Sequence, residues 1–282
     1  MAVFFKLMRE GTITSAEASL TSSLPLTITF LGTGTSQGVP MVGCSCEVCG
    51  SSDPRDNRTR SSVYISTRDF AWVIDTGPEF RIQCLREKIS RLDAVVYTHS
   101  HTDHIMGFDD LRPFCQGEND LPVYASAETM ADLQRVFNFA FTQRPGVPGY
   151  VRPHPRLVHE PFALGDTLLT PLPLKHGRAH VNGYLMETAG RKVAAYLSDC
   201  KEVPEVVIER IAGVEALIID ALRYKEHPTH LSIPEAMEVA ARIRPSVTWF
   251  THLSHDVSHA KAEAELPPEF RIAYDGLKLM LT

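Results

Sequence analysis

Three histidines and an aspartate directly follow an apolar run in the first half of the chain. The run Ala94–Thr98 has the composition of a buried strand, and His99, His101, Asp103 and His104 come immediately after it. Because His99 and His101 are two positions apart, their side chains can point the same way at the end of a strand. Imidazole and carboxylate groups together suit zinc, manganese or iron. The segment therefore predicts a metal site rather than an ordinary polar turn.

The bulk properties indicate one large enzyme domain. The 282 residues suit a single large α/β sandwich, and 44% hydrophobic with 22% charged residues is the balance of a soluble globular enzyme. The net charge of -6 argues against a protein that coats nucleic acid. It does not exclude a nuclease, because bound divalent ions add positive charge. No apolar run approaches the roughly 20 residues of a transmembrane helix, so we expect a cytoplasmic protein without membrane contact.

Strand-like and helix-like runs share the chain from residue 26 onward. Strands come in groups with helices between some of them, which favours layered sheets with outer helices over a doubly wound parallel sheet. We expect one domain over 26–282 and a flexible extension over 1–25, which lacks the apolar core of a secretory signal. The predicted strands are Leu26–Leu31, Ser62–Ser66, Ala71–Asp75, Ala94–Thr98, Thr167–Leu172, Val193–Leu197, Ala216–Asp220, Val247–Thr251 and Leu277–Leu281, and the predicted helices are Phe80–Ile89, Ala127–Phe139, Val203–Ile211 and Ile233–Ile243.

Several predicted strands end in an aspartate or a histidine, namely Asp75, His99, Asp199, Asp220 and His252. Groups presented at strand ends are fixed by a rigid scaffold, which a metal or catalytic site requires. Metal-bound imidazoles also need an acceptor for their second ring N–H, and we expect Asp75 to supply one. Cys200 follows Asp199 and should point to the opposite face as a buried thiol.

Three of the six cysteines, Cys44, Cys46 and Cys49, crowd into one short segment. A disulfide framework would be unusual in a domain of this size, so the cluster favours metal binding in a reducing compartment. Structural zinc takes four ligands from cysteine and histidine, and no fourth cysteine lies nearby in the sequence.

The segment His99-Ser-His101-Thr-Asp103-His104 matches the H-x-H-x-D-H motif, and with it the chain resembles the metallo-β-lactamase superfamily. Further family marks are Thr29–Thr35, Asp75–Gly77, His176–Gly177, Ser198–Asp199 and Thr251–His252. The resemblance implies a four-layer αββα sandwich with two active-site divalent ions, Mn²⁺ or Zn²⁺. The ligands that it implies are His99, His101 and His176 for one ion, Asp103, His104 and His252 for the second, and Asp199 as the bridge.

The segment Gly32–Cys44 and the cysteine cluster narrow the resemblance to the PhnP-type branch, phosphodiesterases that act on cyclic ribose phosphates. That branch takes its fourth structural ligand from a histidine three residues past the last active-site histidine, which is His255 here. The resemblance thus implies one structural Zn²⁺ held by Cys44, Cys46, Cys49 and His255. His230 matches the branch's histidine near the scissile phosphate, and His227 is its local competitor.

The resemblance implies a binuclear phosphodiesterase that acts on small phosphodiesters through a hydroxide bridging the two ions, with Asp103 and His230 as candidate catalytic residues. His230 could bind the phosphate or protonate the leaving oxygen. The alternatives are a tRNA 3′-processing endonuclease, a thioester hydrolase of the glyoxalase II type or a β-lactamase, and a non-catalytic binding protein on the same scaffold. The sequence does not favour a nucleic-acid partner, and it leaves a homodimer open.

A Pro/Gly-rich stretch, Thr142–Leu157, contains Arg144, Arg152 and Arg156 and no acidic residue. It either borders the site and attracts an anionic substrate or is a solvated loop, and the sequence favours neither.

Overall fold

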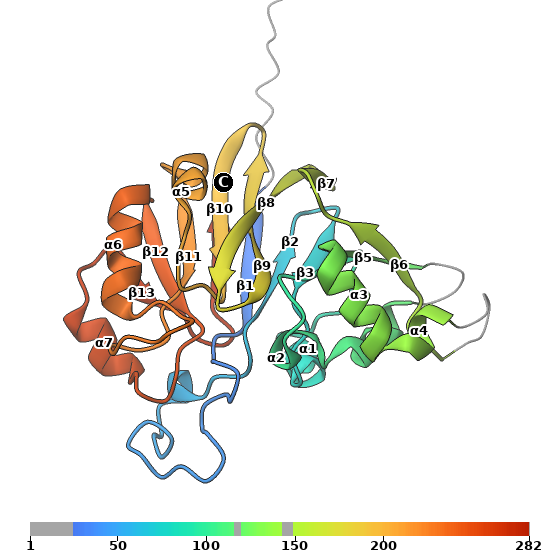
Figure 1. Cartoon of the computed structure of the whole chain (residues 1–282). Helices are drawn as coiled ribbons and strands as arrows, with labels where there is room; N and C mark the ends of the chain where they lie inside the picture. The colour runs from blue at the N-terminus through green and yellow to red at the C-terminus, as the bar shows by residue number, and fades with distance from the viewer. Residues whose placement is uncertain (1–24, 116–119, 143–148, 282) are drawn as a thin grey trace, which may run out of the picture.

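The computed structural model describes residues 25–115, 120–142 and 149–281. The predicted N-terminal extension, apart from its last residue, lies outside this part of the chain, as does Arg144. Two seven-stranded sheets form the centre of the molecule (Figure 1). The first has the order β14-β1-β2-β3-β4-β5-β6 and the second β13-β12-β11-β10-β9-β8-β7.

The first sheet contains β1 (Leu26–Gly32), β2 (Ser62–Ser66), β3 (Ala71–Ile74), β4 (Ala94–Val96), β5 (Leu121–Ala125), β6 (Pro153–Leu157) and β14 (Lys278–Leu281). The second contains β7 (Phe162–Leu164), β8 (Thr167–His176), β9 (Ala179–Thr188), β10 (Arg191–Leu197), β11 (Ala216–Asp220), β12 (Val247–Thr251) and β13 (Phe270–Ile272). The helices are α1 (Phe80–Glu87), α2 (Thr102–Ile105), α3 (Ala127–Val136), α4 (Asn138–Thr142), α5 (Glu205–Ile211), α6 (Ile233–Ile243) and α7 (His259–Glu265), with 3-10 turns η1 (Pro54–Asp56) and η2 (Phe108–Phe114).

Three apolar layers hold the sandwich together. In β11, Ala216 and Ile218 face the layer between the two sheets, whereas Leu217 and Ile219 face the layer under α5 and α6. This division follows from the alternation of side chains along a strand. A third layer joins the first sheet to α1 and α3. Figure 1 shows helices outside both sheets, which confirms the predicted αββα class.

Every predicted strand and helix is present. β2, β11, β12 and α6 have the predicted ends, and the others have shifted ends. The strands β5, β6, β7, β9 and β13 were not predicted. β6 occupies part of the Pro/Gly-rich stretch Thr142–Leu157, for which the sequence predicts no strand. It contains Pro153 and Pro155, which lack the N–H of a central strand, and it lies at the edge of its sheet, where proline is tolerated. In β9, Asn182 and Gly183 interrupt the apolar pattern. β7 and β13 have three residues each, too few to show a period.

The start of α6 fixes the chain that leads into it. Ser232 Oγ accepts from the Glu235 N–H at 3.4 Å, and the Glu235 side chain accepts from the Ser232 N–H at 2.8 Å. This is a capping box, and such a cap stabilises a helix by about 0.5–2 kcal/mol. It anchors the loop that carries His230, two residues earlier.

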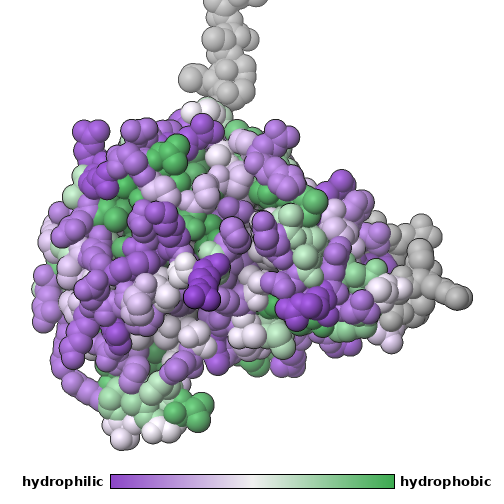
Figure 2. All heavy atoms as spheres, in the orientation of Figure 1, coloured by the Kyte–Doolittle hydropathy of each residue, from purple (hydrophilic) through white to green (hydrophobic). Residues whose placement is uncertain are grey.

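The segment between β1 and β2 projects from the sandwich at the bottom of Figure 1. Figure 2 shows apolar side chains on this lobe below a largely hydrophilic face, and Val42 is 97% exposed there.

All six cysteines have free thiols. Among the helices described, none has the length and apolar character needed to span a bilayer.

Candidate metal centre

The sheets bring their polar strand ends to one edge of the sandwich. β10, β11 and β12 are parallel, so the residues at or after their carboxyl ends, Asp199, Asp220 and His252, lie together. β3 and β4 are parallel in the other sheet and place Asp75 and His99 at their own ends. Three of these residues have left-handed backbones, with φ of 63° at Asp75, 52° at Asp199 and 59° at His252. Such a conformation costs a non-glycine residue about 1–3 kcal/mol, and it clusters where side chains must be aimed.

Asp199 lies between two groups of imidazoles. Its Oδ2 is 3.8 Å from Nε2 of His99 and 4.0 Å from Nε2 of His176. Its Oδ1 is 3.2 Å from Nε2 of both His104 and His252. A carboxylate whose two oxygens face two donor groups has the arrangement that a bridge between two ions requires.

The two groups contain the seven residues that the sequence pointed to. In each group the candidate ligand atoms lie within 4.8 Å of one another. One group consists of His99, His101, His176 and Asp199, and the other of Asp103, His104, Asp199 and His252. The structure therefore brings the predicted set together, and metal binding by it stays a prediction.

The donor atoms themselves fit divalent cations. The Nε2 atoms of His99, His104 and His252 are buried and have no hydrogen-bond partner. A buried unpaired nitrogen costs about 1–3 kcal/mol, and three of them converge here on the carboxylates of Asp103 and Asp199. Cations between these groups would give each nitrogen a partner and balance the carboxylates.

The electrostatics of the metal-free chain show the same demand for positive charge. Burial opposes ionisation of Asp199, but the adjacent His104 and His252 hold its pKa well below the usual value. Burial also opposes a charged His252, yet Asp199, Asp220 and Asp103 raise its pKa to about 9. A cation bound beside His252 competes with a proton on this imidazole, so metal binding should weaken as the pH falls.

Hydrogen bonds aim the imidazoles. Nδ1 of His104 donates to Asp75 Oδ2 at 2.8 Å, which is the contact expected for Asp75. Nδ1 of His99 is 2.9 Å from the Thr98 hydroxyl, which in turn donates to Asp75 at 2.7 Å. With each Nδ1 occupied in this way, each Nε2 is left to face the centre of its group.

His230 lies beside both groups. Its ring centroid is 4.6 Å from that of His176 and 4.7 Å from that of His252. Its Nδ1 donates to Asp220 Oδ2 at 2.7 Å, and the Cys200 N–H donates to the same oxygen at 2.9 Å. The sequence reading noted Asp220 as a strand end but gave it no partner. Cys200 is buried among apolar residues, as predicted.

The site opens into a cavity of about 470 Å³. Its lining comprises Ser36, His101, Asp103, His176, Gly177, Arg178, Ala179, Asp199, His227, Thr229, His230 and His252. The arginine on this wall is Arg178, which the sequence reading did not single out. Of the arginines it did consider, Arg152 pairs with Asp120 and Arg156 is exposed on the edge strand β6, and neither lines the cavity.

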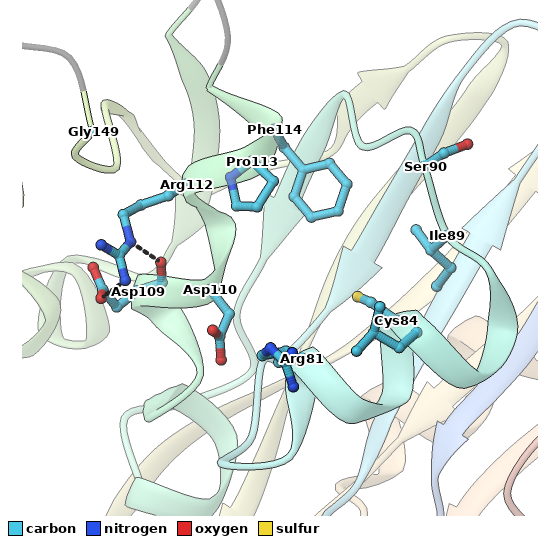
Figure 3. A pocket seen from close by; sticks show the side chains of 11 residues that line it. Arg81, Cys84, Ile89, Ser90, Asp109, Asp110, Arg112, Pro113, Phe114 and Gly149 are labelled. Carbon is cyan, nitrogen blue, oxygen red and sulfur yellow. Dashed lines mark hydrogen bonds and ion pairs between the residues drawn. The ribbon is translucent and has the colours of Figure 1, made fainter.

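A larger hollow, of about 670 Å³, lies between α1 and η2 (Figure 3). Its wall includes Arg81, Cys84, Ile89, Asp110 and Phe114 but no histidine. Burial raises the pKa of the Cys84 thiol to about 12, so this sulfur is protonated and unreactive at neutral pH. The larger of these two hollows is therefore not the one that contains the candidate metal ligands.

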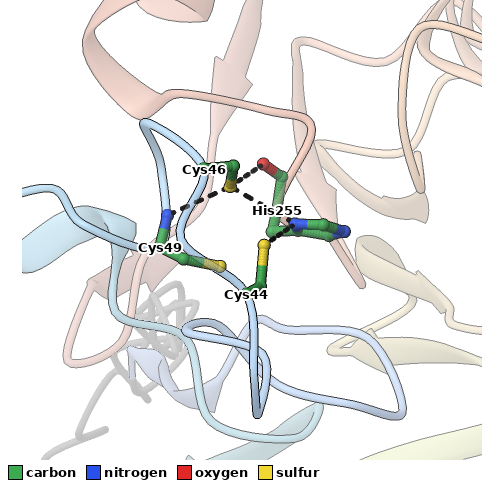
Figure 4. A group of neighbouring side chains, drawn as sticks. All are labelled: Cys44, Cys46, Cys49 and His255. Atoms are coloured by element: carbon green, nitrogen blue, oxygen red, sulfur yellow. Dashed lines mark hydrogen bonds between the residues drawn. The ribbon is translucent and has the colours of Figure 1, made fainter.

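The cysteine cluster meets His255 (Figure 4). The His255 Nδ1 lies 3.3 Å from Cys44 Sγ and 3.4 Å from Cys46 Sγ, and Cys49 completes the group. A hydrogen bond from the Cys49 backbone N–H and a second one with the His255 side chain lower the pKa of the Cys46 thiol to about 6. Burial raises the pKa of the Cys49 thiol to about 11. Three thiols and one imidazole are a donor set for tetrahedral structural zinc.

The two candidate metal centres share one segment of chain. Leu253, next to His252, pairs with the segment after β1, since its N–H donates to Thr33 O at 2.8 Å and its carbonyl accepts from Thr35 N at 3.1 Å. The segment that contains His252 and Leu253 continues directly to His255. A metal on the cysteines would therefore hold the loop that bears His252.

Comparisons with known proteins agree with this geometry. The family model for the beta-lactamase superfamily domain matches residues 72–253. A solved structure, described as a new diphosphatase from the PhnP family, is 40% identical, covers 91% of this chain and 97% of its own, and superposes with a TM-score of 0.84. The fold and site thus define a metallo-β-lactamase-fold hydrolase. Within that class, the chain belongs to the PhnP family of the superfamily.

Two curated relatives carry other names. A protein named octanoyltransferase from Porphyromonas gingivalis is 38% identical over 259 residues, which cover 89% of this chain and 51% of the relative. The chain thus spans about half the length of that relative. Coenzyme PQQ synthesis protein B from Methylorubrum populi is 28% identical over 221 residues, which cover 68% of this chain and 72% of the relative.

Replacing Cys46 with serine tests the cysteine centre. We expect purified Cys46→Ser protein to lose about one zinc per chain, because structural zinc needs its four ligands. Its Tm should fall by several degrees, since about 1 kcal/mol shifts Tm by roughly 2–4 °C in a large domain. Elemental analysis and calorimetry provide the measurement, with Cys84→Ser as the matched control. Unchanged zinc content and Tm would rule out the structural centre.

Replacing Asp199 with alanine tests the bridge. We expect at least about a 100-fold loss of turnover on an aryl phosphodiester, because even indirect support of a ligand is worth about 10–100-fold. The circular dichroism spectrum should stay that of the wild type, since the change is confined to the site. Asp166→Ala, an exposed carboxylate on a turn, is the control. Near-normal turnover by Asp199→Ala would contradict the two-metal assignment.

Proposed function

We propose that this protein is a binuclear metallohydrolase that cleaves small phosphodiesters, with five-membered cyclic ribose phosphates as its preferred class. The observation that carries the proposal is the position of Asp199, whose two oxygens face two histidine groups. The seven residues of these groups would hold two divalent ions, Mn²⁺ or Zn²⁺. Such a pair orients a phosphate, lowers the pKa of a bound water and balances developing charge.

The protein's own groups supply the proton for the leaving oxygen. His230 has its Nδ1 bound to Asp220, which leaves Nε2 as its other polar atom, on the wall of the cavity. The buried carboxylate of Asp220 balances the charge of a protonated His230. An imidazole in this position can deliver a proton to the leaving oxygen as the bond to phosphorus breaks. His101 is exposed, so the site is open to substrate on that side.

The name of the 40% identical structure favours a second candidate, hydrolysis of a diphosphate bond. Both reactions displace an oxygen from a doubly substituted phosphate, and the same two-metal arrangement suits both. They differ in the leaving group. A leaving phosphate is weakly basic and needs little protonation, whereas a sugar alkoxide is strongly basic and needs an acid beside it. Dependence on His230 therefore separates the two.

The remaining alternatives have less support. A tRNA-processing nuclease would need a basic RNA-binding surface, and the net charge is -6 with one arginine on the cavity wall. A thioester hydrolase has no use for an acid such as His230, because a thiolate leaves readily. A non-catalytic binding protein has no need of two complete groups of candidate ligands that share one carboxylate.

The acid role of His230 has a distinct kinetic signature. General acid catalysis contributes about 10²–10⁴-fold, so His230→Ala should lose that much kcat on a ribose cyclic phosphate. The loss on bis(4-nitrophenyl) phosphate should be much smaller, because the aryl oxide leaves unprotonated. Steady-state kinetics on both substrates provide the measurement. His159→Ala, an exposed histidine away from the cavity, is the control, and His227→Ala tests the local competitor.

Two outcomes would revise this picture at different levels. An equal loss on both substrates would mean that His230 binds the phosphate, which both share, and would defeat its role as acid. Clear thioesterase activity without hydrolysis of any diester, in the presence of Mn²⁺ or Zn²⁺, would overturn the proposed function.

Asp220 is a positioning residue for His230, and its conservative replacement tests that role. In Asp220→Asn the amide keeps the shape but removes the charge that balances a protonated His230. We expect at least about a 10-fold loss on the ribose substrate with little change on the aryl diester. Asp220 is also 3.9 Å from Nδ1 of His252, so metal content must be measured alongside. A uniform loss on both substrates together with lost metal would assign Asp220 to the metal centre instead.

A further inference from the structure

We propose that Ser198 is a positioning residue for the metal centre, because its hydroxyl holds the carboxylate of Asp199 in the orientation that faces both groups of imidazoles. This inference rests on the proposed function, in which Asp199 bridges two ions. Ser198 is buried directly after β10 and belongs to neither group of candidate ligands. The sequence marks it as part of the segment Ser198–Asp199 but gives it no role of its own.

The backbone is fixed on both sides of Asp199. Before it, Leu197 is the last residue of β10 and pairs with β11. After it, the Cys200 N–H donates to Asp220 Oδ2 at 2.9 Å, and the Cys200 carbonyl accepts from the Leu231 N–H at 2.8 Å. The left-handed φ of 52° at Asp199 lies between these two anchors. The fold therefore sets the place from which the Asp199 side chain starts.

Rotation of the carboxylate is the freedom that remains. The terminal torsion of an aspartate is broad, so a fixed backbone does not by itself decide where the two oxygens point. The Ser198 hydroxyl restrains this torsion, since it donates to Asp199 Oδ1 at 2.7 Å. Both side chains are buried, so bulk water does not compete for the hydrogen bond. A hydrogen bond to a carboxylate is also among the stronger kinds.

The hydrogen bond reaches one oxygen of the carboxylate and thereby fixes both. Oδ1, which accepts from Ser198, lies 3.2 Å from Nε2 of both His104 and His252. Oδ2 is directed at the opposite group, 3.8 Å from Nε2 of His99 and 4.0 Å from Nε2 of His176. Because the carboxylate is planar and rigid, holding Oδ1 in one group keeps Oδ2 in the other.

The imidazoles around Asp199 cannot take over this role once cations are bound. A ring nitrogen that binds a metal ion has lost its proton and no longer donates a hydrogen bond. The Ser198 hydroxyl lies outside both groups and keeps its proton. It can therefore restrain the carboxylate before and after metal binding.

The two ions should depend on Ser198 to different extents. A single ion can draw a freely rotating carboxylate toward its own group of imidazoles. A second ion then finds the remaining oxygen in place only if the carboxylate already spans both groups. Loss of the hydroxyl should therefore weaken binding of the second ion more than binding of the first.

Replacing Ser198 with alanine tests this role through metal binding. Groups that orient a ligand are worth about 10–100-fold in metal affinity, and we expect Ser198→Ala to lose affinity for the second Mn²⁺ ion in that range. Calorimetric titration of Mn²⁺ into protein stripped of exchangeable ions gives both affinities. Electron paramagnetic resonance gives an independent signature, because neighbouring Mn²⁺ ions are spin-coupled. At equal Mn²⁺ loading, the variant should show isolated ions where the wild type shows the coupled pair.

Two further variants assign the effect to the hydroxyl. Ser198→Thr keeps a hydroxyl and should restore most of the affinity for the second ion. Thr188→Val is the matched control, because it removes a buried hydroxyl that has no hydrogen-bond partner, at the end of β9 opposite to the one that pairs with His176. Its Mn²⁺ affinities should equal those of the wild type. With bis(4-nitrophenyl) phosphate, Ser198→Ala should need roughly 10–100-fold more Mn²⁺ for half-maximal turnover.

The possible failures are distinguishable. If Ser198→Ala binds both Mn²⁺ ions as the wild type does, or if Ser198→Thr loses as much affinity as Ser198→Ala, the hydroxyl does not position the carboxylate, and the binuclear hydrolase stands. If the wild type itself takes up neither two Mn²⁺ nor two Zn²⁺ ions at the imidazole groups, the two-metal assignment falls and the role of Ser198 falls with it.

Discussion

The carboxylate of Asp199 faces two groups of imidazoles at once, and the arrangement of the sandwich serves this contact. Its oxygens approach imidazoles from the segment after β4, from β8, from α2 and from the segment after β12, so both sheets position them. No single sheet could supply them. The apolar layer between the sheets therefore stabilises the fold and also sets the distance across which one carboxylate must reach. Left-handed backbones at Asp199 and His252 are sustained because that layer fixes the strands before them.

The loop between β11 and α6 lines the cavity with His227, Thr229 and His230. It begins at Asp220, which holds His230, and it ends at the capping box of Ser232 and Glu235. Between these anchors Thr229 binds two histidines, since its carbonyl accepts from Nδ1 of His176 at 2.8 Å while its N–H donates to His227. One short stretch of backbone thus holds His176, His227 and His230 in place. A substitution that loosens the cap would disturb all three together.

Some residues of the metal groups could be predicted from the sequence alone and others could not, and the reasons are physical. The cluster from His99 to His104 is contiguous, so its spacing alone indicates a metal site. His176, Asp199 and His252 follow ordinary apolar runs, and only the family resemblance joined them, because periodicity carries no information about which strand ends meet in space. In the sequence, Asp220 looks like any other aspartate at the end of a predicted strand. Its hydrogen bond with His230 is visible only in the folded structure.

Arg178 shows where such reasoning fails and why. The sequence draws attention to the stretch with three arginines, but charge density along the chain does not report distance from a site. Part of that stretch forms β6, which the order of the first sheet places at its edge, next to β5. A single arginine in a tight turn has no pattern, yet the turn follows His176 directly and the glycine before it packs on the loop that carries His230. In this fold the residues that line the cavity are set by which loops share the open edge of the sandwich. The core thus determines the chemistry that is possible, and the turns determine which molecule it acts on.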